Sequence, residues 1–179
     1  MNNHWPHAPP HRFLEKGTYM ITGSTYEKVH HFRDEQRLSY LTDRLLQTIE
    51  GSNWRIQAWS VFSNHYHFIA FSPDDPEKLK KMLQLLHYET ASEINKMDGC
   101  PGRMVWYNSW DSHITFRQSY MARLNYVHNN PVKHKIVKDA EEYPYCSAHW
   151  FRSTADKSFY HSINRFDTSS VNVYDDFDV

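Results

Sequence analysis

A run of aromatic and aliphatic residues from 54 to 71 constrains the fold of this chain more than any other stretch. Both parts of the run have the composition of strands, and Ser63 and Asn64 between them suit a tight turn. The run therefore predicts a β-hairpin with strands at residues 54–62 and 65–71.

The second predicted strand begins with His65, Tyr66 and His67. Side chains at positions i and i+2 of a strand point to the same face, so both imidazoles are expected to point in one direction. Neutral imidazole is a common metal ligand, and two from one strand leave positions open for a third protein group and a substrate. The pair predicts a metal site. Because the chain has thirteen histidines, a hydrogen-bonded core pair remains the alternative.

The other elements follow from propensity and periodicity. Strand-forming residues predict strands at 18–26 and 104–114. Capping residues precede apolar repeats at Asp34, Asp75 and Thr115, and they predict three helices, the third through a capping box. The order β-α-β-β-α-β followed by α predicts an α+β, ferredoxin-like (RRM-like) fold, with an antiparallel sheet and helices on one face.

The length of 179 residues fits one domain with two polar ends. A Pro-rich flexible arm is predicted at 1–16, the domain at 17–152 and an acidic C-terminal tail at 153–179. Residues 101–140 contain six Lys or Arg against two Asp, whereas 141–179 contain seven Asp or Glu against three Lys or Arg. A basic segment therefore precedes an acidic one.

Composition also excludes several classes. The net charge of −1 argues against a general polyanion binder, which needs many Lys and Arg contacts. Two cysteines are too few for a disulfide scaffold. No apolar stretch is long enough to span a membrane, and the first residues lack a signal core. We therefore expect a cytoplasmic protein without a membrane partner.

A second motif lies in the third predicted helix, where Tyr126 precedes Asn130 by four residues. Residues i and i+4 share a helix face, so the phenol and the amide are expected to project together. Pro131 places Asn130 in or just past the last turn. From the residues alone, a packing tyrosine followed by a helix terminator remains an alternative.

The two motifs together resemble a known family. Asn64-His65-Tyr66-His67, followed by the run Tyr126-Val-His-Asn-Asn-Pro-Val-Lys133, resembles the REP-associated tyrosine transposases, a branch of the single-tyrosine HUH (IS200-like) transposases. The resemblance extends from about residue 17 to residue 151. It implies the HUH endonuclease type of the ferredoxin-like fold.

The resemblance also implies the roles of four residues. His65 and His67 correspond to the HUH metal ligands, Asn130 to the third ligand and Tyr126 to the nucleophile. The implied reaction cleaves and rejoins single-stranded DNA, expected to be a REP-like hairpin, through a 5′-phosphotyrosine intermediate. The implied cofactor is a divalent metal, Mg²⁺ or Mn²⁺. The chain is expected to act as a monomer or homodimer.

Four residues near this motif are candidate contacts to the DNA backbone, with a solvated basic turn as the alternative: Arg123, Lys133, His134 and Lys135. The family often has glycine at the position of Lys135, so the local turn is expected to differ. A catalytically silent protein that binds hairpin DNA remains the alternative function.

Overall fold

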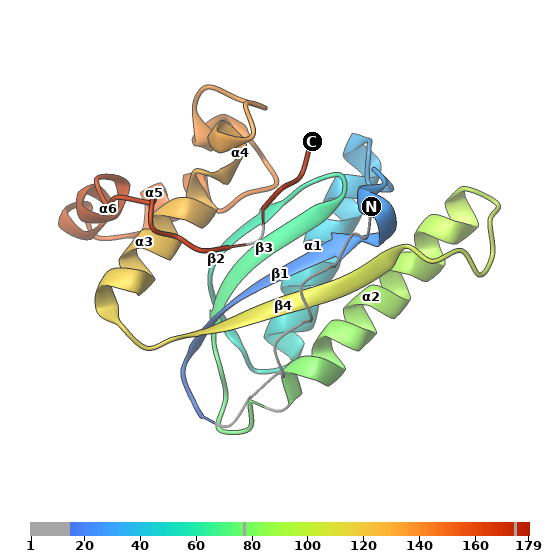
Figure 1. The fold of residues 1–179 in the computed structure, drawn as a ribbon, viewed down its shortest axis with the longest axis horizontal. Coiled ribbons are helices and arrows are strands. Elements are labelled where there is room, and N and C mark those ends of the chain that lie inside the picture. Colours follow the sequence, from blue (N-terminus) through green and yellow to red (C-terminus); the bar gives the residue numbers. More distant parts are fainter. Residues whose placement is uncertain (1–14, 77, 174) are drawn as a thin grey trace, which may run out of the picture.

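The computed structural model describes residues 15–76, 78–173 and 175–179. Its centre is a four-stranded antiparallel sheet with the order β2-β3-β1-β4, the strand order of a ferredoxin-like sandwich (Figure 1). All four predicted strands are present, each within two residues of its expected bounds: β1 (Thr18–Thr25), β2 (Arg55–Val61), β3 (His65–Phe71) and β4 (Trp106–Ile114).

Helices cover both faces of the sheet. The first face packs on α1 (Glu35–Gly51) and α2 (Lys78–Met97), as predicted, through a large cluster that includes Tyr66 and Phe68 of β3. The opposite face packs on α3 (Arg117–His128) through a second cluster that includes Ile69. Because side chains alternate along a strand, His65 and His67 share the face of Ile69 and point toward α3.

The helix ends test two predicted caps. Asp34 caps α1, since its carboxylate accepts from the Arg37 N–H at 3.0 Å. The predicted capping box at Thr115 is wrong, because α3 begins one residue later than that box requires. Phe116 is its N-cap residue and makes no side-chain cap bond.

The chain beyond α3 forms short helical elements. They are α4 (Asn130–Lys133), η2 (Ala140–Glu142), α5 (Ala148–Thr154) and α6 (Lys157–Asn164); η1 (Tyr26–Lys28) lies earlier, after β1. The second hydrophobic cluster joins α5 and α6 to α3, since it contains Phe151, Phe159 and Ile163.

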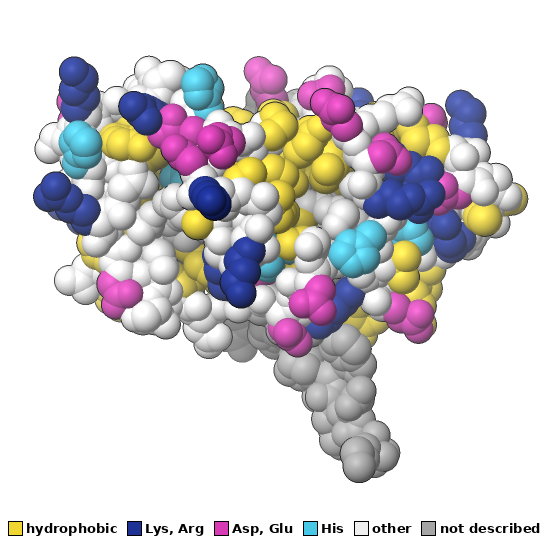
Figure 2. Space-filling view, turned by 90° about the horizontal axis from the view of Figure 1, so that it is seen from above, with side chains coloured by type: hydrophobic (Ala, Val, Ile, Leu, Met, Phe, Trp, Pro, Cys, Tyr) yellow, Lys and Arg dark blue, Asp and Glu magenta, His cyan; other side chains and the backbone are white. Residues whose placement is uncertain are grey.

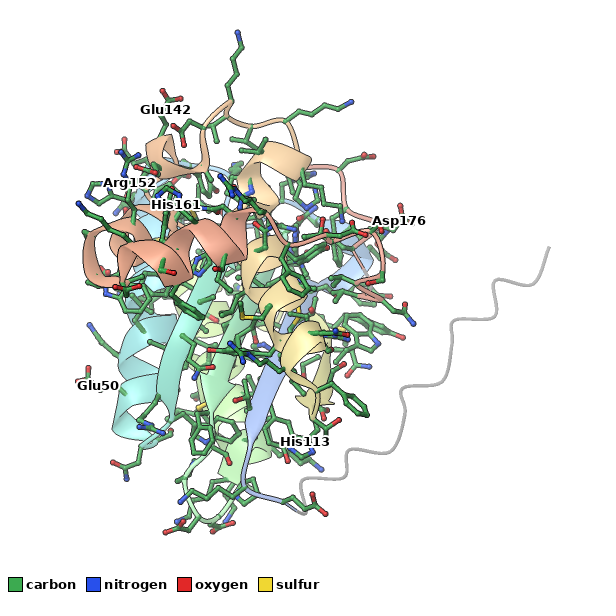
Figure 3. All side chains as sticks on the ribbon, turned by 90° about the vertical axis from the view of Figure 1, so that its left-hand side faces the viewer. Glu50, His113, Glu142, Arg152, His161 and Asp176 are labelled. Atoms are coloured by element: carbon green, nitrogen blue, oxygen red, sulfur yellow. The ribbon has the colours of Figure 1, made fainter. Side chains whose placement is uncertain are left out.

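The final residues return to the sheet. Figure 3 shows Asp176 on the side of α3 away from Arg152 and His161, so the C-terminal segment crosses α3 after α6. Phe177 then stacks on His65 of β3, with ring centroids 4.1 Å apart. The segment predicted as an acidic tail thus contains α6 and ends against β3.

The described residues leave two expectations from the sequence untested. Nearly all of the arm predicted at 1–16 lies outside them, and the domain boundaries stay a prediction. Within the described part of the chain, no helix combines the length and apolar character needed to cross a bilayer.

Candidate metal centre and nucleophile

Strand β3 and helix α3 bring the predicted histidines and the predicted tyrosine together. The side chains of His65 and His67 are fully buried, and Tyr126 is 7% exposed. The ring centroids lie 5.0 Å apart between the two histidines and 5.8 Å apart between His67 and Tyr126. Residues 59 positions apart in the chain therefore share one small site.

Hydrogen bonds hold both imidazoles in place. His65 Nδ1 lies 2.8 Å from Asn64 Oδ1, while the Asn64 amide nitrogen donates to the Lys28 carbonyl at 3.2 Å. An amide oxygen only accepts, so His65 Nδ1 carries the proton and Nε2 keeps a lone pair. His67 Nδ1 lies 2.8 Å from Thr22 Oγ1. Both Nε2 atoms are thus the ones that face the site.

Both histidines are neutral at physiological pH. Burial lowers the pKa of His65 and of His67, and a charge on the neighbouring His67 would lower that of His65 further. Neutral imidazole is the form that can coordinate a metal.

Asn130 reaches the same site from just past the end of α3. The helix ends at His128. Asn130 is the first residue of the short helix α4, and Pro131 is the second. Asn130 is fully buried. Because proline lacks an N–H, it fits the first turn of this new helical segment.

The same turn contains the residue that replaces the family's glycine. Lys135 has φ = 59°, and the turn closes through hydrogen bonds from the Lys135 and Ile136 N–H groups to Val132 and Pro131 carbonyls, each at 3.0 Å. Lys135 therefore takes the left-handed conformation that glycine tolerates at low cost. The substitution puts strain on Lys135 while the turn still closes.

One residue that sequence reasoning missed lies at the centre of the site. The Asp175 side chain is 1% exposed, and its Oδ1 lies 3.0 Å from His134 Nε2. The same oxygen is 3.4 Å from His67 Nε2 and 3.5 Å from His65 Nε2. Three imidazoles therefore surround one carboxylate oxygen.

The second Asp175 oxygen meets the predicted nucleophile, Tyr126, and its neighbours. Oδ2 accepts from Lys133 Nζ at 2.5 Å, from Asn130 Nδ2 at 3.1 Å and from the Tyr126 hydroxyl. Lys133 Nζ also donates to the Tyr126 hydroxyl oxygen at 2.8 Å and lies 4.6 Å from the centre of its ring. The carboxylate thus links every predicted ligand to the predicted nucleophile.

These contacts fix the charges in the site. Burial alone would raise the pKa of Asp175, but hydrogen bonds from His134, His67 and Lys133 hold it far below its usual range. Asp175 is therefore ionised. Burial, and then the Asp175 carboxylate, raise the pKa of Tyr126, so the phenol is protonated at neutral pH.

The site has the donors of a metal centre. His65, His134 and Asp175 hold their ligand atoms within 4.8 Å of one another, which makes them a candidate metal site. His65 Nε2 and Asn130 Oδ1 are buried without a hydrogen-bond partner among the described residues. Buried lone pairs without a donor cost free energy unless a cation or a water meets them. These residues therefore fit a bound divalent ion.

The protein was also compared with known proteins. No protein-family model matches the chain. It is 23% identical over 140 residues to the REP-associated tyrosine transposase of Escherichia coli (strain K12), covering 76% of this chain and 79% of that protein. A solved structure of a REP-associated tyrosine transposase bound to a REP hairpin superposes with a TM-score of 0.69. The two are 18% identical, and the match covers 90% of this chain and 92% of that one.

The chain is similar in sequence and in fold to the REP-associated tyrosine transposases. The family resemblance and the fold class expected from the sequence are thereby confirmed. A putative transposase from Deinococcus radiodurans is more distant, with 12% identity over 68% of this chain and 95% of that one and a TM-score of 0.47.

Two of the four candidate contacts to the DNA backbone lie in the site. Lys133 and His134 both bind Asp175. Arg123 is half-buried and donates to Ser119 on its own helix, and Lys135 is exposed. Figure 2 shows basic side chains interleaved with acidic ones on the face seen from above, so charge is mixed over this surface.

Proposed function

We propose that the chain is a metal-dependent tyrosine transposase, which cleaves and rejoins single-stranded DNA at a hairpin. One observation carries the proposal. A buried anion, the Asp175 carboxylate, lies where the predicted nucleophile Tyr126 meets the predicted ligands and Lys133. Groups that hold a carboxylate in this way are suited to hold a phosphate in the same place.

The chemistry assigned to Tyr126 is transesterification. Its hydroxyl oxygen loses its proton and attacks the phosphorus, the bond to the 3′ oxygen breaks, and the leaving 3′ oxygen takes up a proton to become a hydroxyl, so one proton moves on balance from the phenol to the 3′ oxygen. A 5′-phosphotyrosine results, and attack by a 3′-hydroxyl reverses the step. Lys133, which donates to the hydroxyl at 2.8 Å, would stabilise the negative charge that develops on that oxygen.

His65, His67 and Asn130 would hold a divalent ion, Mg²⁺ or Mn²⁺, which as a Lewis acid offsets charge on the phosphate oxygens. All three donors are neutral, so they leave the full charge of the ion for the phosphate. His134 and Asp175 offer a second set of donors with His65. The ionised Asp175 competes with the phosphate for the same positive groups.

The proposed substrate is a DNA hairpin with a single-stranded flank. The solved relative bound to a REP hairpin supports this choice. Arg123, Lys133, His134 and Lys135 would contact the backbone, which fixes position without reading sequence. The protein would act as a monomer or homodimer.

A denaturing-gel assay tests the proposal. Hairpin DNA with single-stranded flanks and Mn²⁺ should give a covalent protein–DNA adduct, and Tyr126→Phe should abolish it. Tyr120→Phe is a matched control, because Tyr120 lies on the same helix and packs against the same hydrophobic cluster, but its hydroxyl is not among the described groups that bond Asp175. An adduct that survives Tyr126→Phe would remove that residue as nucleophile.

The alternative function is binding of hairpin DNA without cutting, in a protein whose Asp175 carboxylate never leaves the site. The carboxylate binds both the nucleophile and Lys133, as a permanently closed site requires. This alternative predicts a salt-sensitive gel shift of hairpin DNA and no adduct with any metal, including in an Asp175→Asn variant.

A further inference from the structure

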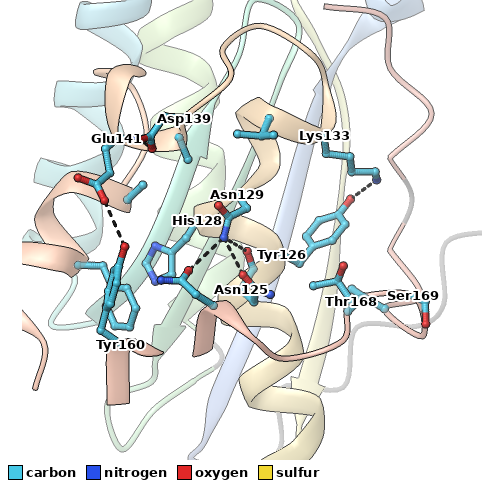
Figure 4. Close-up of a pocket in the computed structure, with 16 residues that line it drawn as sticks. Asn125, Tyr126, His128, Asn129, Lys133, Asp139, Glu141, Tyr160, Thr168 and Ser169 are labelled. Atoms are coloured by element: carbon cyan, nitrogen blue, oxygen red, sulfur yellow. Dashed lines mark hydrogen bonds between the residues drawn. The ribbon is translucent and has the colours of Figure 1, made fainter. Parts of the chain in front are cut away.

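A large pocket adjoins the nucleophile. Its volume is about 830 Å³, and α3, α4, α5, α6 and the segment that follows α6 line it (Figure 4). Tyr126 and Lys133 belong to its wall as well as to the metal centre. A group in this pocket therefore lies beside Tyr126, the proposed nucleophile. The volume falls within the usual range for small-molecule sites, about 300–1,000 Å³.

The charges of the wall indicate which part of a substrate fits. Lys133 is the one Lys or Arg among the lining residues, and it stands beside Tyr126. Asp139 and Glu141 line another part of the wall, where they would repel a phosphate. The occupant beyond Lys133 is therefore neutral, or it presents hydrogen-bond donors.

The wall also contains aromatic rings: His128 and Phe151 are buried, and Tyr160 is half-buried. His128 stacks on Phe151 with ring centroids 4.2 Å apart, and Tyr160 lies 5.7 Å from Phe151. Aromatic walls suit a planar guest, and stacking on such rings is a common way to hold an unpaired base.

Two lone pairs at the wall have no donor among the described residues, and that of the half-buried Asn129 is the one within reach of an occupant. Asn129 uses its side-chain nitrogen to donate to Asn125 and Asn164, while its Oδ1 accepts no hydrogen bond from the described residues. His128 is buried, and its Nε2 also has no partner in the described part of the chain. Its Nδ1 is engaged by the Ser147 hydroxyl at 2.8 Å. An unmet polar group in a pocket wall is a position where a ligand gains free energy.

We infer that this pocket takes the unpaired nucleobase of a nucleotide next to the scissile phosphate, and that Asn129 selects a base with an exocyclic amino group. The inference rests on the proposed function, since it needs a phosphate at Tyr126. A base that carries an amino group donates to Asn129 Oδ1, whereas thymine has no such group. The phosphate stays at the Lys133 side of the pocket, and the base lies against the aromatic rings and amides of the wall.

The experiment uses hairpin DNA that carries an abasic site, or each of the four bases, at either nucleotide flanking the cleavage point. We expect the abasic substrate to lower the initial rate of adduct formation roughly ten- to hundredfold at one of the two positions. A substrate with thymine at that position should react at nearly the same rate as the abasic substrate. Asn129→Leu should remove most of the preference, whereas Gln84→Leu, an exposed amide on α2, should keep it.

A second readout does not depend on cleavage. The fluorescent base 2-aminopurine, placed at the same position, should be quenched when Tyr126→Phe protein binds the hairpin, and Asn129→Leu should weaken the quenching. Quenching without any adduct in the native protein would support the pocket while the proposed function fails. Equal rates for abasic and intact substrates, binding without quenching, or the absence of both binding and adduct would each overturn the inference.

Discussion

Replacing Asp175 by asparagine should speed adduct formation. The substitution keeps the shape of the side chain but removes a buried charge that binds Lys133 at 2.5 Å and His134 at 3.0 Å. In the proposed reaction, a phosphate can enter only when this carboxylate has left. The apparent rate is therefore the rate of the open site multiplied by the fraction of molecules in which the site is open.

The size of the effect follows from the contacts that are lost. Hydrogen bonds to charged groups contribute about 1.5–3 kcal/mol each, and part of this is offset by the cost of burying the carboxylate. The Lys133 side chain is half-exposed, which favours the lower end of this range of free energies. Phe177 still stacks on His65 in the variant, so it continues to hold the C-terminal segment against β3. A net loss of about 1.4–2 kcal/mol corresponds to a rate increase of roughly 10- to 30-fold.

The assay compares initial rates of adduct formation with hairpin DNA and Mn²⁺ at neutral pH. Asp176→Asn is the matched control, because it makes the same change of charge at an exposed neighbour whose carboxylate pairs with Lys28. Equal rates for Asp175→Asn and the native protein would refute the reasoning. A slower variant that needs more metal would instead assign Asp175 to the metal.

Three further predictions concern stability. Lys135→Gly should raise the free energy of unfolding by up to about 1 kcal/mol, because it relieves a positive φ, and urea unfolding checks this. Gly23→Ala should lower it by about 1–3 kcal/mol or more, since a Cβ there would lie 2.4 Å from the buried Tyr66 ring, whereas Gly51→Ala, with open space around it, should not. Burial lowers the pKa of His87 to about 4, below its ordinary 6.5, so the unfolded state binds more protons between these values. Stability should therefore fall as the pH drops from 6.5 to 4, by up to about 3 kcal/mol from this residue, and urea unfolding of His87→Gln should show a weaker dependence.

The sheet was predictable because its strands carry their own signals. Apolar runs and the turn at Ser63 and Asn64 depend on neighbours in sequence, and β2 and β3 formed where these patterns predicted. The alternation of side chains also predicted that His65 and His67 share a face. The capping box at Thr115 was wrong because a helix start is chosen by packing as well as by its local sequence.

The central carboxylate was not predictable in the same way. Asp175 meets Asn130 across 45 residues, from a segment with mixed polarity and no regular periodicity. In the sequence, Asp175 is typical of a solvated acidic tail. Only the path of the chain over α3 brings Asp175 to β3. The place of His134 beside Asp175 depends on the same path. Sequence patterns identify residues that share an element, but they do not identify a partner that arrives from a distant irregular segment.

The most direct test of the account identifies the residue that carries the DNA. The native protein is incubated with flanked hairpin DNA and Mn²⁺ and digested, and the peptide joined to DNA is sequenced by mass spectrometry. The account predicts a nucleotide joined through its 5′-phosphate to the Tyr126 hydroxyl, with a free 3′-hydroxyl on the released strand. Attachment to a different residue, or release of a 3′-phosphate, would contradict it.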